Sequence, residues 1–250
     1  MRLEKKALVL AAIMAVLSAP QSRAVNVVQE PAQHAFDVVV DGAPNRPAPS
    51  GAQLITTVYD NSDQATSPTA TAFSNTAVTT HTWGDELFLT SGGLLSEMKF
   101  SLFNSVSSAG TLLTATVAVE LLNAATSASL GSFSTVVGFG ATGLGQGQYS
   151  VVTVTNLESL SILLSTTNVL VKQRITAKTG TASRTGIASL DPPVVGSSPA
   201  YFFQSSPTVT AGFYTATSGK PVNVLYQIAV TPPPVPARST SWSRVKKLYR

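Results

Sequence analysis

Short runs in which apolar and polar residues alternate dominate the chain between residues 53 and 230. The clearest examples are MKFSLF at 98–103 and TATVAVEL at 114–121, and the texture recurs in VLVKQRIT at 169–176 and NVLYQIAV at 223–230. A period of two places one set of side chains toward a core and the other toward solvent. Each run therefore predicts a β-strand that is buried on one face.

The residues between these runs are typical of turns, because Gly, Ser, Asn and Pro are frequent there. No window of about 12 residues shows a helical period, and no repeat of fixed length is visible. The pattern predicts about ten short strands. We therefore expect an all-β fold, a two-sheet antiparallel sandwich of jelly-roll type.

The N-terminus has the three parts of a secretory signal. Basic residues occur within the first six positions, an apolar run covers 7–17, and the small-x-small site Ser22-Arg23-Ala24 follows. An apolar run of this length is shorter than the roughly 20 residues that span a membrane. We expect cleavage after Ala24, a secreted protein that is extracellular or at the cell surface, and no transmembrane span after removal of the signal.

Proline-rich segments divide the rest of the chain. Residues 25–52 hold one possible strand, DVVVDG, followed by APNRPAPSGA, and we expect them to form an N-terminal arm or linker. Residues 53–230 form the predicted β-sandwich domain, and 231–250 a Pro-rich spacer with a basic C-terminal tail. The chain has no Cys, so the domain is stabilised by its core without disulfides.

The net charge of +4 arises at the two ends of the chain. Residues 25–236 hold seven basic and eleven acidic residues, whereas the last thirteen hold five basic residues and no acidic one. A nucleic-acid-binding domain gathers its basic residues on the folded surface. This distribution therefore argues against a nucleic-acid partner.

Four segments in a consistent order resemble a family of bacterial secreted proteins found mainly in planctomycetes, many of which carry a PEP-CTERM or other C-terminal sorting signal. The segments are LITTVYDNS at 54–62, LFLTSGGLLSEMKFSLFN at 87–104, LDPPVVGSSPAYFF at 190–203 and NVLYQIAV at 223–230. The resemblance implies a β-sandwich at the cell surface or in the extracellular matrix, with no assigned activity. Acidic residues often continue the third segment in that family, but Ser198-Pro199-Ala200 stand here.

The C-terminal tail departs from a PEP-CTERM signal because it lacks an apolar span. STSWSRVKKLYR instead resembles short W-x-x-[VI]-K-x-L-Y-R endings on exported proteins of Gram-negative bacteria. We interpret it as a sorting tail that export or anchoring machinery reads; the alternative is a solubilising end. The residues that match are Trp242, Val245, Lys246, Leu248, Tyr249 and Arg250.

No catalytic motif stands out, and we expect no enzymatic activity. His81 and Asp85 in HTWGDE are the residues available for a hydrolytic triad, but no G-x-S-x-G motif accompanies them. Zinc is disfavoured, since the body has no Cys and only His81 besides His34 in the arm. The glycine-rich segment 138–148 precedes a strand pattern and not a helix, which favours a flexible hairpin connection over a phosphate-binding loop.

We expect no cofactor, with calcium as the one alternative. The sequence clusters oxygen donors at Asp60-Asn61-Ser62-Asp63 and at Asp85-Glu86, although the EF-hand spacing is absent.

Two functional hypotheses follow. The first is a non-enzymatic structural or interaction protein of the bacterial envelope or extracellular matrix. The second is a carbohydrate-binding module in which aromatic rings stack on sugars of a polysaccharide. The available rings are those of Tyr59, Trp83, Tyr149, Tyr201, Phe202, Phe203, Phe213 and Tyr214.

Overall fold

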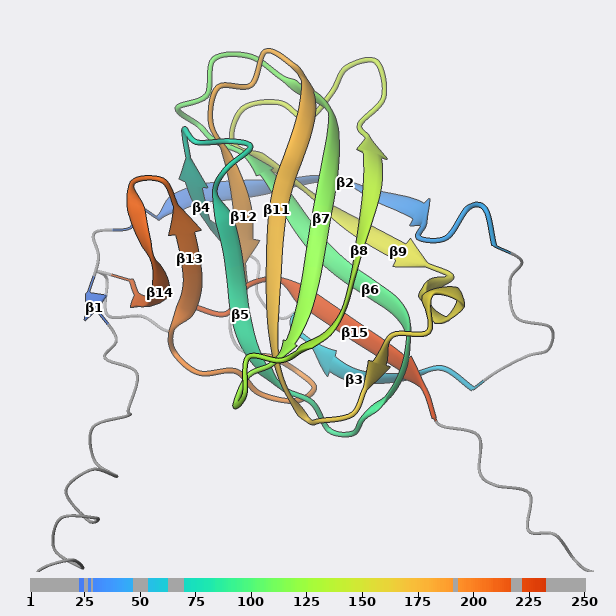
Figure 1. Cartoon of the computed structure of the whole chain (residues 1–250). Helices are drawn as coiled ribbons and strands as arrows, with labels where there is room; N and C mark the ends of the chain where they lie inside the picture. The colour runs from blue at the N-terminus through green and yellow to red at the C-terminus, as the bar shows by residue number, and fades with distance from the viewer. Residues whose placement is uncertain are drawn as a thin grey trace, which may run out of the picture.

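Two β-sheets packed face to face make up the computed structural model of this chain (Figure 1). It describes residues 23–24, 27, 29–46, 54–62, 70–190, 193–216 and 222–232. Apart from one short 3-10 helix, η1 (Leu157–Leu160), the regular structure of these residues is strand. The prediction of an all-β sandwich of two sheets is confirmed.

The first sheet, called the front sheet here, has seven strands in the order β1-β14-β13-β5-β11-β7-β8. In that order the strands are β1 (Arg23–Ala24), β14 (Val209–Thr215), β13 (Phe202–Ser206), β5 (Thr82–Phe88), β11 (Asn168–Gly180), β7 (Leu112–Asn123) and β8 (Ser129–Gly138). All neighbours are antiparallel except β1, which runs parallel to β14.

The second sheet, called the back sheet, crosses behind the front sheet (Figure 1). Its main path runs through β12 (Thr185–Ser189), β4 (Ala70–Asn75), β2 (Glu30–Asp41), β9 (Gln148–Thr155), β6 (Gly93–Asn104), β15 (Tyr226–Thr231) and β3 (Thr56–Asp60). A short strand, β10 (Leu163–Leu164), also pairs with β6. Because β12 pairs with β6 as well as with β4, the strands from β12 to β6 close into a ring. The sequence did not predict this closure.

The main core lies between the two sheets. Met98, Phe100 and Leu102 of β6 face Val117 and Leu121 of β7 across it, and all five are almost completely buried. Their alternation in the sequence predicted this face correctly. A second cluster, which includes Phe103, Tyr149 and Ala188, occupies the opposite face of the back sheet.

The N-terminal arm needs correction, because β2 is part of the back sheet. It pairs in parallel with β9 over most of its length and antiparallel with β4 at its start. The predicted strand DVVVDG, except for its last residue Gly42, is in the second half of β2, and Val38 and Val40 pack against the main core. The sandwich therefore includes residues before position 53.

The glycine-rich segment 138–148 is not a hairpin connection. It leads from β8 in the front sheet to β9 in the back sheet, and it is held midway by two backbone hydrogen bonds between Leu144 and Leu112. Gly140, Gly143 and Gly147 have φ near +70° (72°, 68° and 69°), a conformation that favours glycine. These glycines therefore allow the backbone turns by which the chain passes from the front sheet to the back sheet.

The segment after β12 also crosses between the sheets, and its described residues 193–200 belong to none of the named strands. Val195 bridges to Asp60, and Ser197 bridges to Phe88. These contacts tie the segment to β3 and β5.

The two ends of the chain lie largely outside the described residues. The expected signal is described only at Arg23 and Ala24, whose backbone pairs with Tyr214 and Thr215. The sorting tail, with Trp242, Val245, Lys246, Leu248, Tyr249 and Arg250, lies entirely outside them. Among the residues that are described, no helix is long and apolar enough to cross a membrane.

Candidate functional site

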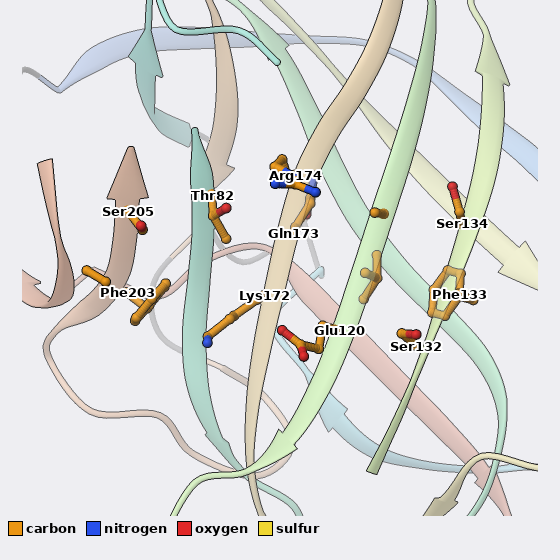
Figure 2. A pocket seen from close by; sticks show the side chains of 13 residues that line it. Thr82, Glu120, Ser132, Phe133, Ser134, Lys172, Gln173, Arg174, Phe203 and Ser205 are labelled. Atoms are coloured by element: carbon orange, nitrogen blue, oxygen red, sulfur yellow. The ribbon is translucent and has the colours of Figure 1, made fainter. Parts of the chain in front are cut away.

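The outer face of the front sheet carries a groove of about 710 Å³, called the front-sheet groove here. Figure 2 shows its floor, formed by β5, β11 and β7, with β13 and β8 on either side. The side chains that turn outward into it are mostly polar and belong to Thr82, Ala118, Glu120, Ser132, Ser134, Lys172, Arg174 and Ser205. Ligand pockets usually measure roughly 300–1,000 Å³, so the groove is large enough for a small molecule or part of a polymer.

Strand register aligns one row of outward-facing positions across the sheet. Phe203 pairs with Gly84, Gly84 with Lys172, Lys172 with Glu120, and Glu120 with Ser132. Because Gly84 has no side chain, nothing separates Lys172 from Phe203. The Lys172 Nζ lies 4.7 Å from the centre of the Phe203 ring, in a cation–π contact (Figure 2).

The next row has small side chains on both sides of one cation. Arg174 pairs with Thr82 of β5 and with Ala118 of β7, and Ala118 pairs with Ser134 of β8. Arg174 is exposed and has no hydrogen bond or ion pair with another described residue. The small neighbours leave space around the guanidinium, and this row is the open part of the groove.

Phe203 lines the groove at β13, and two further rings, those of Phe213 in β14 and Tyr201 just before β13, lie behind it in a chain of ring contacts. Phe213 makes edge contacts with Tyr201 and Phe203, with ring centres 5.0 and 5.8 Å apart. The Tyr201 hydroxyl donates a hydrogen bond of 2.7 Å to Glu86 Oε2. Burial, the bond to Glu86 and its negative charge together raise the pKa of Tyr201 to about 12, so this phenol stays protonated.

The aromatic side chains do not form the exposed row expected of a carbohydrate-binding face. Most of the rings that the sequence offered are buried, namely those of Tyr59, Trp83, Tyr149, Phe202 and Tyr214. Phe203 is only 8% exposed, and Lys172 lies on its ring. The groove therefore presents charged and hydroxyl groups, with aromatic rings only at its edge.

His81 and Asp85 do not form a catalytic pair. Both side chains are buried, Asp85 in β5 and His81 directly before it, and Trp83 lies between them along the chain. The His81 ring contacts that of Trp83 in a tilted arrangement, with 4.0 Å between ring centres. Burial lowers the pKa of His81 to about 4, against a smaller opposing effect of Gln204, so the imidazole is neutral at pH 7. Asp85 Oδ2 accepts a hydrogen bond of 2.9 Å from the Val224 backbone N–H.

Asp85 should make the protein less stable as the pH rises. Its carboxyl group is fully buried, and desolvation raises its pKa well above the usual value against the effect of two backbone hydrogen bonds. Above pH 4 the unfolded chain loses this proton while the folded chain keeps it, so the unfolding free energy falls with pH until the folded-state pKa is passed.

The effect of Asp85 is isolated by comparing the wild type with Asp85→Asn. His81, whose pKa is lowered, makes the unfolding free energy rise with pH below about 6.5, but it does so in both proteins. In urea unfolding between pH 4.5 and 9, the unfolding free energy of the variant should rise relative to that of the wild type as the pH rises. The slope can reach about 1.4 kcal/mol per pH unit for one proton. A difference that does not vary with pH would contradict the assignment of a protonated Asp85.

The geometry does not favour the two calcium clusters that the sequence offered. Asp85 points into the core and Glu86 to the outer face, as neighbours on a strand must. Asp60 accepts hydrogen bonds from Ser62 and Gln227, while the Asn61 amide donates to backbone carbonyls. Asp63 lies outside the described residues, and no group of three or more candidate metal ligands occurs within them.

Comparisons with protein families, curated proteins and solved structures found no match for this chain.

Sequence reasoning did not single out Lys172 and Arg174 as site residues. The signal was present in VLVKQRIT, where both residues fall on the polar side of an alternating strand. Their importance depends on Gly84, Ala118 and the other residues of β5, β7 and β8 that the fold places beside them.

Proposed function

We propose that this protein is a secreted, non-enzymatic interaction protein of the bacterial envelope or extracellular matrix, and that it binds polysaccharide in the front-sheet groove. The observation that carries the proposal is the groove itself, a volume of about 710 Å³ on the face of a continuous sheet. Secretion is supported by the signal-like pattern of residues 1–24, and attachment by the basic tail.

The lining of the groove suits a sugar polymer. Hydroxyl groups of Thr82, Ser132, Ser134 and Ser205 can donate and accept hydrogen bonds, as sugar hydroxyls require. They come from strands within one sheet, so their relative positions are set by backbone ladders and binding needs little ordering of the protein. An extended chain can lie across β5, β11 and β7 because the groove is open to solvent.

The test is retardation of the full-length protein in native gels that contain one polysaccharide each, from a panel of neutral and acidic polymers. Ala118→Leu fills the floor of the groove and should lower the affinity for the retained polymer at least about tenfold, because bulk replaces the space that the ligand occupies. Thr116→Leu is the matched control, since Thr116 lies on the same face of β7 but does not line the groove.

Equal retardation of Ala118→Leu and the wild type would show that the polymer binds elsewhere. Failure of the wild type to bind any polymer in the panel would overturn polysaccharide binding.

A further inference from the structure

We propose that the front-sheet groove selects acidic polysaccharides, and that Lys172 and Arg174 bind the carboxylate groups of their sugar units. The inference rests on the proposed function and specifies the class of polymer.

The charge in the groove is opposite in sign to that of the surrounding body. Residues 25–236 carry more acidic than basic residues, eleven against seven. The lining of the groove holds two cations, Lys172 and Arg174, and one carboxylate, Glu120. A locally positive groove in an acidic body attracts an anionic chain to this face and disfavours its binding elsewhere.

The position of the two cations follows from β11. Lys172 and Arg174 are two residues apart in one strand, so both point outward and their backbone positions are roughly 7 Å apart. They face partners without bulk on neighbouring strands, Gly84 in one row and Ala118 in the next. This arrangement leaves both charged ends accessible from the groove.

Within the part of the chain that the structure describes, neither cation forms an ion pair with a carboxylate. Glu120 is the cross-strand neighbour of Lys172, yet the Lys172 amine points across β5 to Phe203 and makes no ion pair with Glu120 (Figure 2). A cation–π contact is a weak restraint compared with a charge-assisted hydrogen bond to a carboxylate. An incoming carboxylate can therefore draw the amine from the ring, and Arg174 can bind a second one through its planar guanidinium.

Glu120 makes the two sides of Lys172 electrostatically different. Its carboxylate points from β7 toward β11, on the side of Lys172 away from Phe203 (Figure 2). It repels a ligand carboxylate placed beside it and accepts hydrogen bonds from sugar hydroxyls instead. The acidic chain is thus expected to place its carboxylates toward Arg174 and the Lys172 amine, away from Glu120.

The test compares polygalacturonate with the same polymer after methyl esterification, which removes the charge and keeps the sugar backbone. We expect the full-length protein to bind the acidic form at least about tenfold more tightly in dilute salt. Arg174→Gln should remove most of this preference, whereas Glu120→Gln should strengthen binding of the acidic form. Lys178→Gln is the control, because it removes a charge from the same strand outside the groove lining.

The two proposals fail in different ways. Equal affinity for the acidic and esterified polymers, or unchanged binding by Arg174→Gln, would overturn selection of acidic chains. If the Ala118→Leu variant still loses binding in that case, the groove remains the polysaccharide site. If the protein binds neutral polymers and not polygalacturonate, acidic selection is likewise overturned, and thermal unfolding of each variant verifies that the fold is intact.

Discussion

Gly186→Ala should lower the unfolding free energy by about 4 kcal/mol or more, enough to prevent a marginally stable chain from folding. Gly186 lies in β12 where the ring of the back sheet closes, paired with Ser74 of β4 on one side and Phe103 of β6 on the other. A Cβ atom at this position would lie 1.6 Å from the Phe73 carbonyl oxygen and 2.7 Å from the Ser74 Cα.

The clash cannot be relieved by a change of rotamer, because the atoms that it involves are backbone. The β4 backbone is held by ladders to β2 and to β12, so moving it breaks hydrogen bonds in the same ring. The substitution therefore forces either an opened ring or a distorted core.

Gly138→Ala is the matched control for this substitution. Apart from its two chain neighbours, no described residue has an atom within 4 Å of a Cβ at Gly138, and its φ is not in the left-handed region. Urea unfolding should show a change within about 0.5 kcal/mol for this variant. Equal stability of the two alanine variants would contradict the close approach of β12 to the β4 backbone at Gly186.

Glu30→Ala should destabilise the protein by about 3 kcal/mol, since it removes the centre of a buried polar network. Glu30 is the first residue of β2 and is only 5% exposed. Its carboxylate accepts hydrogen bonds from the Ser74 hydroxyl, from Ser105 Oγ at 2.6 Å and from the Val106 backbone N–H at 3.0 Å.

Arg184 completes the network around Glu30. Its Nε lies 3.6 Å from Glu30 Oε1 and donates a hydrogen bond to Ser74 Oγ at 2.6 Å. Truncation of Glu30 leaves the Ser105 hydroxyl and the Val106 N–H without their acceptor and removes the charge beside Arg184. Because Glu30 and Ser105 are buried, this loss exceeds that of an exposed pair.

Asp37→Ala, on the same strand, provides the comparison for Glu30. Its carboxylate is exposed and contacts His34 at 2.9 Å, so its loss should change the unfolding free energy by less than about 1 kcal/mol. Both variants are measured by urea unfolding at pH 7. Similar small effects at the two positions would show that the start of β2 does not support the fold.

Regular alternation made the strands of the main core predictable. Residues 98–102 and 114–121 carry an apolar residue at every second position, and these core-facing residues are buried as expected. Phe103 and Ala118 are the exceptions to the alternation, and both lie on the opposite faces of their sheets. The first half of β2 was not predicted, because EPAQHAF has no such period and contains a proline. Glu30 holds it by long-range contacts with Ser74, Ser105 and Arg184, which a single sequence does not show.

The groove could not be predicted from the sequence for a similar reason. Its floor joins residues 82–84, 118–120 and 172–174, which are brought together only by the register of β5, β7 and β11. The residue types that seemed most suited to chemistry, His81 and Asp85, are instead buried in the core. Strand alternation places Lys172 and Arg174 on a polar face, but it does not show which residues of neighbouring strands lie beside them.

The most direct test of the binding site is to locate a bound oligosaccharide by nuclear magnetic resonance. The full-length ¹⁵N-labelled protein would be titrated with an oligogalacturonate, and the amide shifts followed residue by residue. We expect the largest changes at Ala118, Glu120, Lys172 and Arg174, with smaller ones at Ser134. Changes confined to the crossing segments 138–148 and 193–200, or to the back sheet, would contradict a binding site on the front sheet.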